Sequence, residues 1–279
     1  MKISILVLLY SCEIEDSKTI STMINSGVDL RNVDLVIWNN GPIKICKNSI
    51  KNAPFNILNS VTIYETLENL PLSNIYNRFI AECSADRYII LDHDSTLNDK
   101  YLNKSLGYEL LDIGVPLITV NGEIKSPSRN IRKGHESGPY SSKDRIVGIG
   151  SGIVLSRRMC ERVQSKYGNV FDVNFVLYGV DTTFFFRVRE SGWNSYIELI
   201  DGFEHSLSRL EEESIDVKAF RKFERSVSLG LCFRYYFRHV AILVLKTFIK
   251  SVLLRNTLSL TVIFRTFLSG KHPRFEDDV

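Results

Sequence analysis

The segment from Tyr88 to Ser95 reads YIILDHDS, and it constrains the fold and the chemistry of this chain more than any other stretch. Four bulky apolar residues, two of them β-branched, predict a buried strand. Asp92 and Asp94 follow directly, and side chains two residues apart in an extended chain point the same way. Paired carboxylates at the carboxyl end of a strand predict a site for a divalent cation or a phosphate-bearing ligand.

Apolar runs and helical patterns alternate along the first hundred residues. We expect strands at 3–9, 33–38, 61–64 and 88–91 and helices at 16–26 and 71–85, with Ser73 as the N-cap of the second helix. This alternation predicts an α/β fold with a mostly parallel sheet. Ligands of such sheets bind at the carboxyl ends of the strands. We therefore expect the polar residues at those ends to meet in one crevice: Tyr10, Asn39, Asn40, Asp92 and Asp94.

The second half of the chain is less regular. It predicts strands at 115–120, 146–155 and 195–199 and helices at 157–167 and 181–192. Between the first two strands, residues 121–145 are polar and rich in Gly, Ser and Pro, which predicts a long mobile loop.

The C-terminal region differs from the rest in charge. Residues 218–274 contain 12 Lys and Arg against one acid, Glu224, whereas residues 1–217 contain 23 basic and 28 acidic residues. We therefore divide the chain into a catalytic domain at 1–214 and a basic, amphipathic helical region at 215–279. Lys246 and Lys250 are spaced i, i+4 in an otherwise apolar helix, which favours an anionic membrane surface as partner over nucleic acid. The alternative is that these helices pack on the body.

Cysteine usage and hydropathy bear on location. The five cysteines include no C-x-x-C pair, which predicts reduced thiols in a cytoplasmic protein. Lys2 followed by the apolar run 3–9 faintly resembles a signal peptide, but a first buried strand fits better. The sequence has no uncharged apolar run of the roughly 18 residues that a membrane span requires.

The D-x-D segment and six others together resemble one family, the GT-A glycosyltransferases, and especially family 2 enzymes of the bacterial rhamnosyltransferase type. The resemblance runs from about Ile3 to His239. The segments are VIWNNG at 36–41, LSNIYN at 72–77, YIILDHDS at 88–95, GIGSG at 148–152, YGVDTTFFFR at 178–187 with Gly192-Trp193, HSL at 205–207 and RYYFRH at 234–239. Three residues depart from the family pattern: Asn39 replaces an Asp that binds the nucleobase, Val180 replaces a Glu, and His239 replaces an Asn.

The resemblance implies a GT-A fold and an inverting, metal-dependent transfer of a sugar from a nucleotide-sugar donor. Mg²⁺ or Mn²⁺ would be held by Asp92, Asp94 and His205, and Asp181 would be the base that deprotonates the acceptor hydroxyl. Residues implied to bind the donor are Tyr10, Asn39, Asn40, Asn77, Asp92, Gly150 and Ser151. It also implies a lipid-linked glycan acceptor of cell-surface polysaccharide or O-antigen synthesis, on the inner face of the membrane.

Other interpretations of the same residues stay open. Asp181 could be a simple helix N-cap; the helix dipole would lower its pKa and burial would raise it. His205 could be purely structural. The segment LDHDST at 91–96 also fits the D-x-D-x-T pattern of haloacid dehalogenase-type phosphatases, in which Asp92 would be the nucleophile. A non-catalytic membrane-associated subunit is the third possibility.

Overall fold

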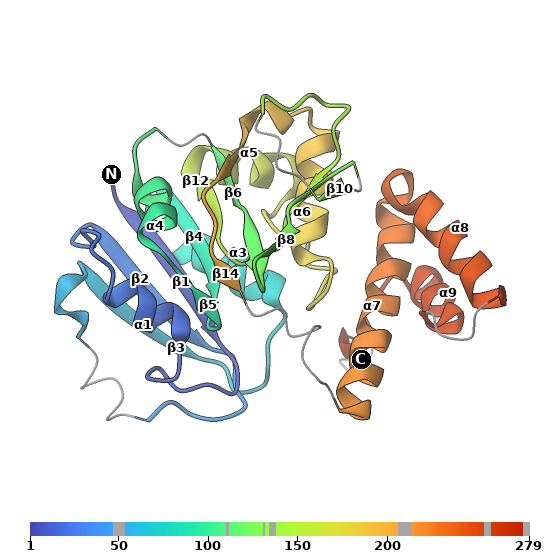
Figure 1. Cartoon of the computed structure of the whole chain (residues 1–279). Helices are drawn as coiled ribbons and strands as arrows, with labels where there is room; N and C mark the ends of the chain where they lie inside the picture. The colour runs from blue at the N-terminus through green and yellow to red at the C-terminus, as the bar shows by residue number, and fades with distance from the viewer. Residues whose placement is uncertain are drawn as a thin grey trace.

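The computed structural model describes residues 1–46, 54–109, 112–130, 132–133, 138–205, 214–253 and 258–275. A seven-stranded sheet forms its centre, in the order β13-β6-β12-β4-β1-β2-β3 (Figure 1). These strands are β1 (Ile3–Leu9), β2 (Val33–Asn39), β3 (Ser60–Glu65), β4 (Arg87–Asp92), β6 (Ile113–Pro116), β12 (Ile153–Ser156) and β13 (Ile197–Ile200). All neighbouring pairs are parallel except those of β12, which is antiparallel to β4 and β6. The predicted mostly parallel α/β sheet is confirmed.

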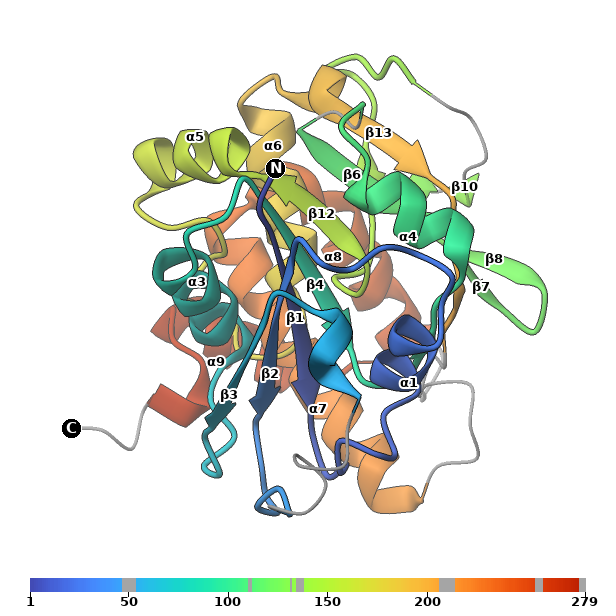
Figure 2. The ribbon, with the colours of Figure 1, turned by 90° about the vertical axis from the view of Figure 1, so that its left-hand side faces the viewer.

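Helices cover both faces of this sheet (Figure 2). One face packs against α1 (Lys18–Ile24) and α4 (Asp99–Leu106), and the other against α3 (Leu72–Glu82), α5 (Arg157–Tyr167) and α6 (Val180–Glu190). Strand β1 shows why both faces are apolar. Ile5 and Val7 belong to the core on the side of α1 and α4, and Leu6 and Leu8 belong to the core on the side of α3, α5 and α6. Residues that alternate along a strand point to opposite faces, so a strand buried on both sides is apolar throughout.

Two small sheets lie beside the central one. The first has the order β5-β14-β7-β8, with β5 (Ser95–Thr96), β14 (Glu204–His205), β7 (Ile118–Val120) and β8 (Glu123–Ser126). The second has the order β10-β9-β11, with β10 (Arg132–Lys133), β9 (Ser128–Arg129) and β11 (Ile146–Val147). Short 3₁₀ helices occur at Phe55–Ile57, Asn194–Tyr196 and Pro273–Phe275.

Three sequence predictions are wrong in this region. The expected strand at 115–120 divides between β6 and β7, which belong to different sheets. The described parts of the expected loop 121–145 include β8 and β9, because Asn121 and Gly122, at φ of 50° and 75°, form the tight turn between β7 and β8. The expected strand at 146–155 is interrupted by a turn that ends at Gly152, whose φ is +85°.

Helix α3 also begins differently from the prediction. Its N-cap is Pro71, and Ser73 lies inside the helix. The Ser73 hydroxyl instead donates a hydrogen bond to the backbone oxygen of Phe175, at 2.5 Å. Ser73 therefore fastens α3 to the segment before α6 and does not cap its own helix.

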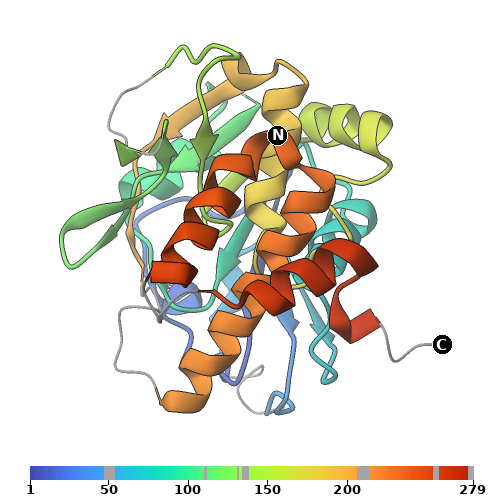
Figure 3. The ribbon, with the colours of Figure 1, turned by 90° about the vertical axis from the view of Figure 1, so that its right-hand side faces the viewer.

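The C-terminal region is helical, as predicted, and consists of α7 (Ile215–Tyr235), α8 (Phe237–Leu253) and α9 (Leu260–Ser269) (Figure 3). Val227 and Leu231 of α7 are fully buried in the core that contains α3, α5 and α6. The Tyr236 hydroxyl accepts a hydrogen bond from Arg187 Nε at 2.9 Å and donates one to Asp172 at 2.6 Å. In the described part of the chain, every helix is too short or too polar to span a bilayer.

Candidate active site

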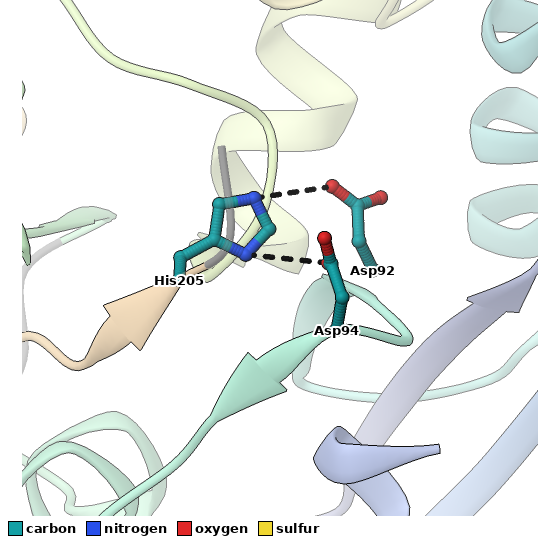
Figure 4. A group of neighbouring side chains, drawn as sticks. All are labelled: Asp92, Asp94 and His205. Atoms are coloured by element: carbon teal, nitrogen blue, oxygen red, sulfur yellow. Dashed lines mark ion pairs between the residues drawn. The ribbon is translucent and has the colours of Figure 1, made fainter. Parts of the chain in front are cut away.

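The D-x-D residues lie where the sequence places them, at the carboxyl end of a central strand. Asp92 is the last residue of β4, and Asp94 lies in the turn that leads to β5. His205, on β14, faces both carboxylates (Figure 4). Its Nε2 is 3.9 Å from Asp92 Oδ2, and its Nδ1 is 3.4 Å from Asp94 Oδ1. The carboxylates therefore meet on one imidazole across a turn, and not along one extended chain as predicted.

These three side chains fit a divalent cation. Each can offer one ligand atom, and these atoms all lie within 4.8 Å of one another. Asp94 Oδ1 is buried and has no hydrogen-bond partner within the described residues, and a buried polar atom in that position is costly unless something binds it. Two carboxylate oxygens and an imidazole nitrogen would fill three coordination positions of such a cation and leave its other positions for oxygen atoms of a bound ligand.

The electrostatics of Asp92 agree with this. Burial raises the pKa of Asp92. The nearby His205 acts to lower this pKa, and the negative charge of Asp94 acts to raise it further. Two carboxylates that face each other in a half-buried place repel, and a cation between them would relieve the repulsion.

A hydrogen-bonded chain of hydroxyl groups contacts both the backbone of Asp92 and the imidazole of His205. The backbone N–H of Asp92 donates to Ser151 Oγ at 3.1 Å, and Ser151 Oγ lies 3.1 Å from Ser95 Oγ. Ser95 Oγ is in turn 3.0 Å from His205 Nδ1. Thr19 joins the chain by accepting from the Ser95 backbone N–H at 2.9 Å. Ser151 thus joins the backbone of Asp92 to Ser95, and Ser95 and Thr19 are parts of this hydrogen-bonded chain that the sequence analysis did not single out, although Ser95 directly follows the D-x-D pair.

Asp181 is the second residue of α6, close to the cluster. The helix N-cap is Gly179, so the alternative in which Asp181 is the N-cap is wrong. One carboxylate oxygen accepts from the Thr182 N–H at 2.7 Å and the other from the Gly150 N–H at 3.1 Å. Burial raises the pKa of Asp181 and outweighs these hydrogen bonds, which lower it. The net direction is upward, as burial predicts, and a raised pKa makes this carboxylate a stronger proton acceptor.

Tyr76 of α3 is another residue that the sequence analysis did not single out. It is buried, and its pKa is raised by burial and then by the negative charges of Asp92 and Asp181. A side chain added at Gly150 would come within 3.9 Å of its hydroxyl. Its phenol therefore lies close to Gly150 and within electrostatic range of both carboxylates. Only the packing of α3 over the strand ends reveals this, because Tyr76 reads in sequence as an ordinary core aromatic.

The residues expected on the nucleotide side fall into two groups. Tyr10, just after β1, is 46% exposed and free to contact a ligand. Asn39 and Asn40 are buried, and their amides are engaged within the protein: Asn39 Nδ2 donates to Glu65 Oε2 at 3.0 Å, and Asn40 Nδ2 donates to the Leu70 backbone oxygen at 2.9 Å. Glu65, the last residue of β3, thus brings a carboxylate beside the Asn that replaces the family's Asp.

The amide of Asn77 is engaged within the protein. Its side chain donates to the Phe171 oxygen at 2.8 Å and accepts from the Phe171 N–H at 2.9 Å, so both ends of the amide bind the segment before α6. Gly150 and Ser151 do lie at the cluster, in the turn before β12. Ser206 and Leu207 of the expected HSL motif lie outside the described residues.

Known proteins resemble this chain in structure but not in sequence. No family model matches it, and no curated protein matches it either. Among solved structures, residues 1–349 of S. aureus TarS cover 82% of this chain and 79% of their own length at 12% identity, with a TM-score of 0.52. The same protein in complex with UDP-GlcNAc matches at 11% identity over 86% of this chain and 73% of that chain, with a TM-score of 0.53.

A mannosyltransferase, PcManGT from Pyrobaculum calidifontis in complex with GDP-Man and Mn²⁺, matches at 11% identity. It covers 85% of this chain and 64% of that chain, with a TM-score of 0.52. At such identities the likeness is one of fold, and it confirms the GT-A fold that the sequence predicts.

Proposed function

We propose that this protein is a metal-dependent glycosyltransferase that moves a sugar from a nucleotide-sugar donor to a glycan acceptor. The observation that carries the proposal is the cluster of Asp92, Asp94 and His205 at the carboxyl edge of the sheet, with the buried carboxylate of Asp181 close by. A cation site beside a separate base is what transfer from a diphosphate leaving group to a hydroxyl requires. The ligands of the structural neighbours support it, since TarS is seen with UDP-GlcNAc and PcManGT with GDP-Man and Mn²⁺.

Each residue then has a defined role. Asp94 and His205 would hold Mg²⁺ or Mn²⁺, with Asp92 as a third ligand or a contact to the ribose. When bound there, the cation would supply positive charge opposite the departing nucleoside diphosphate. Asp181 takes the proton of the acceptor hydroxyl as that hydroxyl attacks the anomeric carbon from the opposite face, which inverts the configuration.

The resemblance to family 2 enzymes of the rhamnosyltransferase type extends this proposal to a hexosyl donor and to cell-surface polysaccharide or O-antigen synthesis. Tyr10 and Glu65, which are exposed, would line the nucleotide side, and the buried Asn39 would hold the Glu65 carboxylate in place. Glu65 would supply the carboxylate that an Asp provides for the nucleobase in the family that this chain resembles.

We further propose a lipid-linked glycan as acceptor and a cytoplasmic enzyme bound peripherally to the inner face of the membrane. In this view the catalytic unit spans residues 1–214, and residues 215–279 provide the membrane contact. The supporting observation is that residues 218–274 contain 12 basic residues against a single acid.

A donor screen tests the proposed function. Nucleotide release is measured with Mn²⁺ and with EDTA across UDP-, GDP- and dTDP-sugars, each with and without a glycan acceptor. We expect release from one nucleotide class, dependent on the cation and accelerated by the acceptor. Release of inorganic phosphate from phosphomonoesters, with a phosphoryl group trapped on Asp92, would replace the proposal with a phosphatase.

A further inference from the structure

A cluster of positively charged side chains lies at the end of α6 that is far from Asp181. A cavity of about 300 Å³ opens there between the end of β9, the start of β11, the last turn of α6 and the first turns of α8. It is lined by Asn130, Arg145, Arg189, Arg238, His239 and Ile242. Arg189 and Asp181 are eight residues apart on α6, which separates the cavity from the base by about 12 Å at 1.5 Å per residue.

The arginines of this cavity carry uncompensated charge. Arg189 donates only weak hydrogen bonds, at 3.4 Å, to the backbone oxygens of Ser142 and Lys143. The Arg145 guanidinium lies over the Phe186 ring, 5.5 Å from its centre, and burial together with the charge of Arg189 lowers the pKa of Arg145. Arg238 is exposed. None of these three guanidinium groups forms an ion pair with a carboxylate among the described residues.

His239 adds a second sign of a missing partner. Its Nε2 lies 3.0 Å from Glu190, the acid next to the cavity, whereas its Nδ1 is buried without a hydrogen-bond partner in the described part of the chain. Three guanidinium groups around one small space suit a phosphate group, because each offers several N–H donors in a fixed plane.

The surface next to the cavity is apolar. Helix α8 exposes large hydrophobic side chains along its length: Phe237, Ile242, Leu243, Leu245, Phe248, Ile249 and Leu253. Ile242, which is 70% exposed, also lines the cavity. Lys246 and Lys250 lie among them, and no Asp or Glu occurs anywhere from residue 225 to 275. An apolar helix surface that carries only positive charge is complementary to an anionic lipid surface.

We propose that the cavity of Arg145, Arg189 and Arg238 binds the phosphate of an anionic phospholipid headgroup while the exposed face of α8 contacts the acyl region. The phosphate enters between α6 and α8, and the lipid chains follow the helix from Ile242 toward Leu253. This inference deepens the membrane association proposed above and rests on it. It adds a defined headgroup site to an association otherwise attributed to general charge.

Vesicle sedimentation with matched variants separates a site from general charge. The full chain is mixed with phosphatidylcholine vesicles that contain or lack phosphatidylglycerol, with and without glycerol 1-phosphate as soluble competitor. The pocket variants are Arg189→Gln, on α6, and Arg238→Gln, on α8. The control is Lys250→Gln, which removes the same charge from α8 outside the cavity. Thermal unfolding and donor-dependent nucleotide release in solution are measured on every preparation.

We expect Lys250→Gln to lower partition onto phosphatidylglycerol vesicles about fivefold, since one basic residue near an anionic surface contributes roughly 1 kcal/mol. Each pocket variant should lower it by roughly 10- to 100-fold, since hydrogen bonds to a charged group are lost as well. Glycerol 1-phosphate should compete with the wild type and not with the pocket variants.

Equal losses in all three variants, with no competition, would overturn the headgroup site and leave membrane association by general charge. Absence of wild-type binding to phosphatidylglycerol vesicles, or a concentration-dependent dimer that covers α8 in its place, would overturn both membrane proposals. Nucleotide release in solution reports on the transferase proposal separately, because it does not involve this cavity.

Discussion

At the scale of single residues, the hydroxyl of Ser151 links the metal-binding cluster to the backbone of β4. Removing it in Ser151→Ala takes an acceptor from the Asp92 N–H and a neighbour from Ser95. Loss of a residue that orients metal ligands typically costs 10- to 100-fold in metal affinity, and we expect a loss in this range for Mn²⁺. Calorimetric titration of Mn²⁺ measures it. The exposed Ser165→Ala on α5 is the control, and equal affinities in the two variants would contradict the role of Ser151.

The buried carboxylate of Asp181 is the proposed base. Asp181→Asn keeps the size of the side chain and one acceptor oxygen but cannot take a proton. We therefore expect donor affinity close to that of the wild type and a turnover lower by roughly 10²- to 10⁴-fold. Calorimetry of donor binding and product analysis on one preparation check both parts. If transfer by Asp181→Asn matched that of the wild type, the base would have to be sought elsewhere.

The sequence predicted some of these site residues and missed others, for identifiable reasons. Asp92 and Asp94 could be predicted because they follow an apolar strand directly, and His205 and Asp181 because they fall in ordered motifs. Ser95, Thr19, Tyr76 and Glu65 could not, because their importance arises from which strand end or helix lies beside them. Asn77 shows the converse: it matches a motif, but its amide is engaged by the backbone of Phe171.

At the scale of elements, Gly179 fixes where α6 begins and hence where Asp181 points. Its φ is +92°, and an added Cβ would lie 2.6 Å from Phe175 and from Ser228. Gly168, at the end of α5, has a similar φ of +82° but open space around it. We expect Gly168→Ala to cost about 1–2 kcal/mol of stability through backbone strain alone, and Gly179→Ala a further 1–3 kcal/mol through overpacking.

Chemical denaturation of the two glycine variants measures the difference. Gly179→Ala should also weaken turnover, because Asp181 lies two residues further on, whereas Gly168→Ala should not. Equal stabilities of the two variants would show that the space around Gly179 can adjust without cost.

The elements themselves were predictable where one pattern covered a whole strand or helix, as in β1, β4 and α5. Prediction failed where one apolar run serves two sheets: the residues from Val115 to Val120 look continuous, but the chain passes from β6 to β7 within them. The Asn121-Gly122 pair is a typical hairpin turn sequence, but it lies within the expected loop at 121–145 and so was not used to predict a hairpin.

At the scale of the whole molecule, the C-terminal helices share a core with the body. Val227 and Leu231 of α7 and the ring of Tyr236 pack into it, and burial of each such side chain contributes about 1.5–3 kcal/mol. A few of them approach the 5–15 kcal/mol of an entire fold. We therefore expect residues 1–214 alone to lack a cooperative unfolding transition in near-ultraviolet circular dichroism. A sharp transition for that fragment would show that the body is stable without the helices.

The central claim is that Asp92, Asp94 and His205 bind the cation through which a nucleotide-sugar is held, and Asp94→Ala tests it most directly. Asp94 lies in a turn, so its removal should leave the unfolding midpoint close to that of the wild type. The measurement is calorimetric titration of UDP and GDP with and without Mn²⁺ for both proteins. We expect one of the two nucleotides to bind the wild type with Mn²⁺, and we expect folded Asp94→Ala to lose this binding. Nucleotide binding by the variant with unchanged dependence on Mn²⁺ would contradict it.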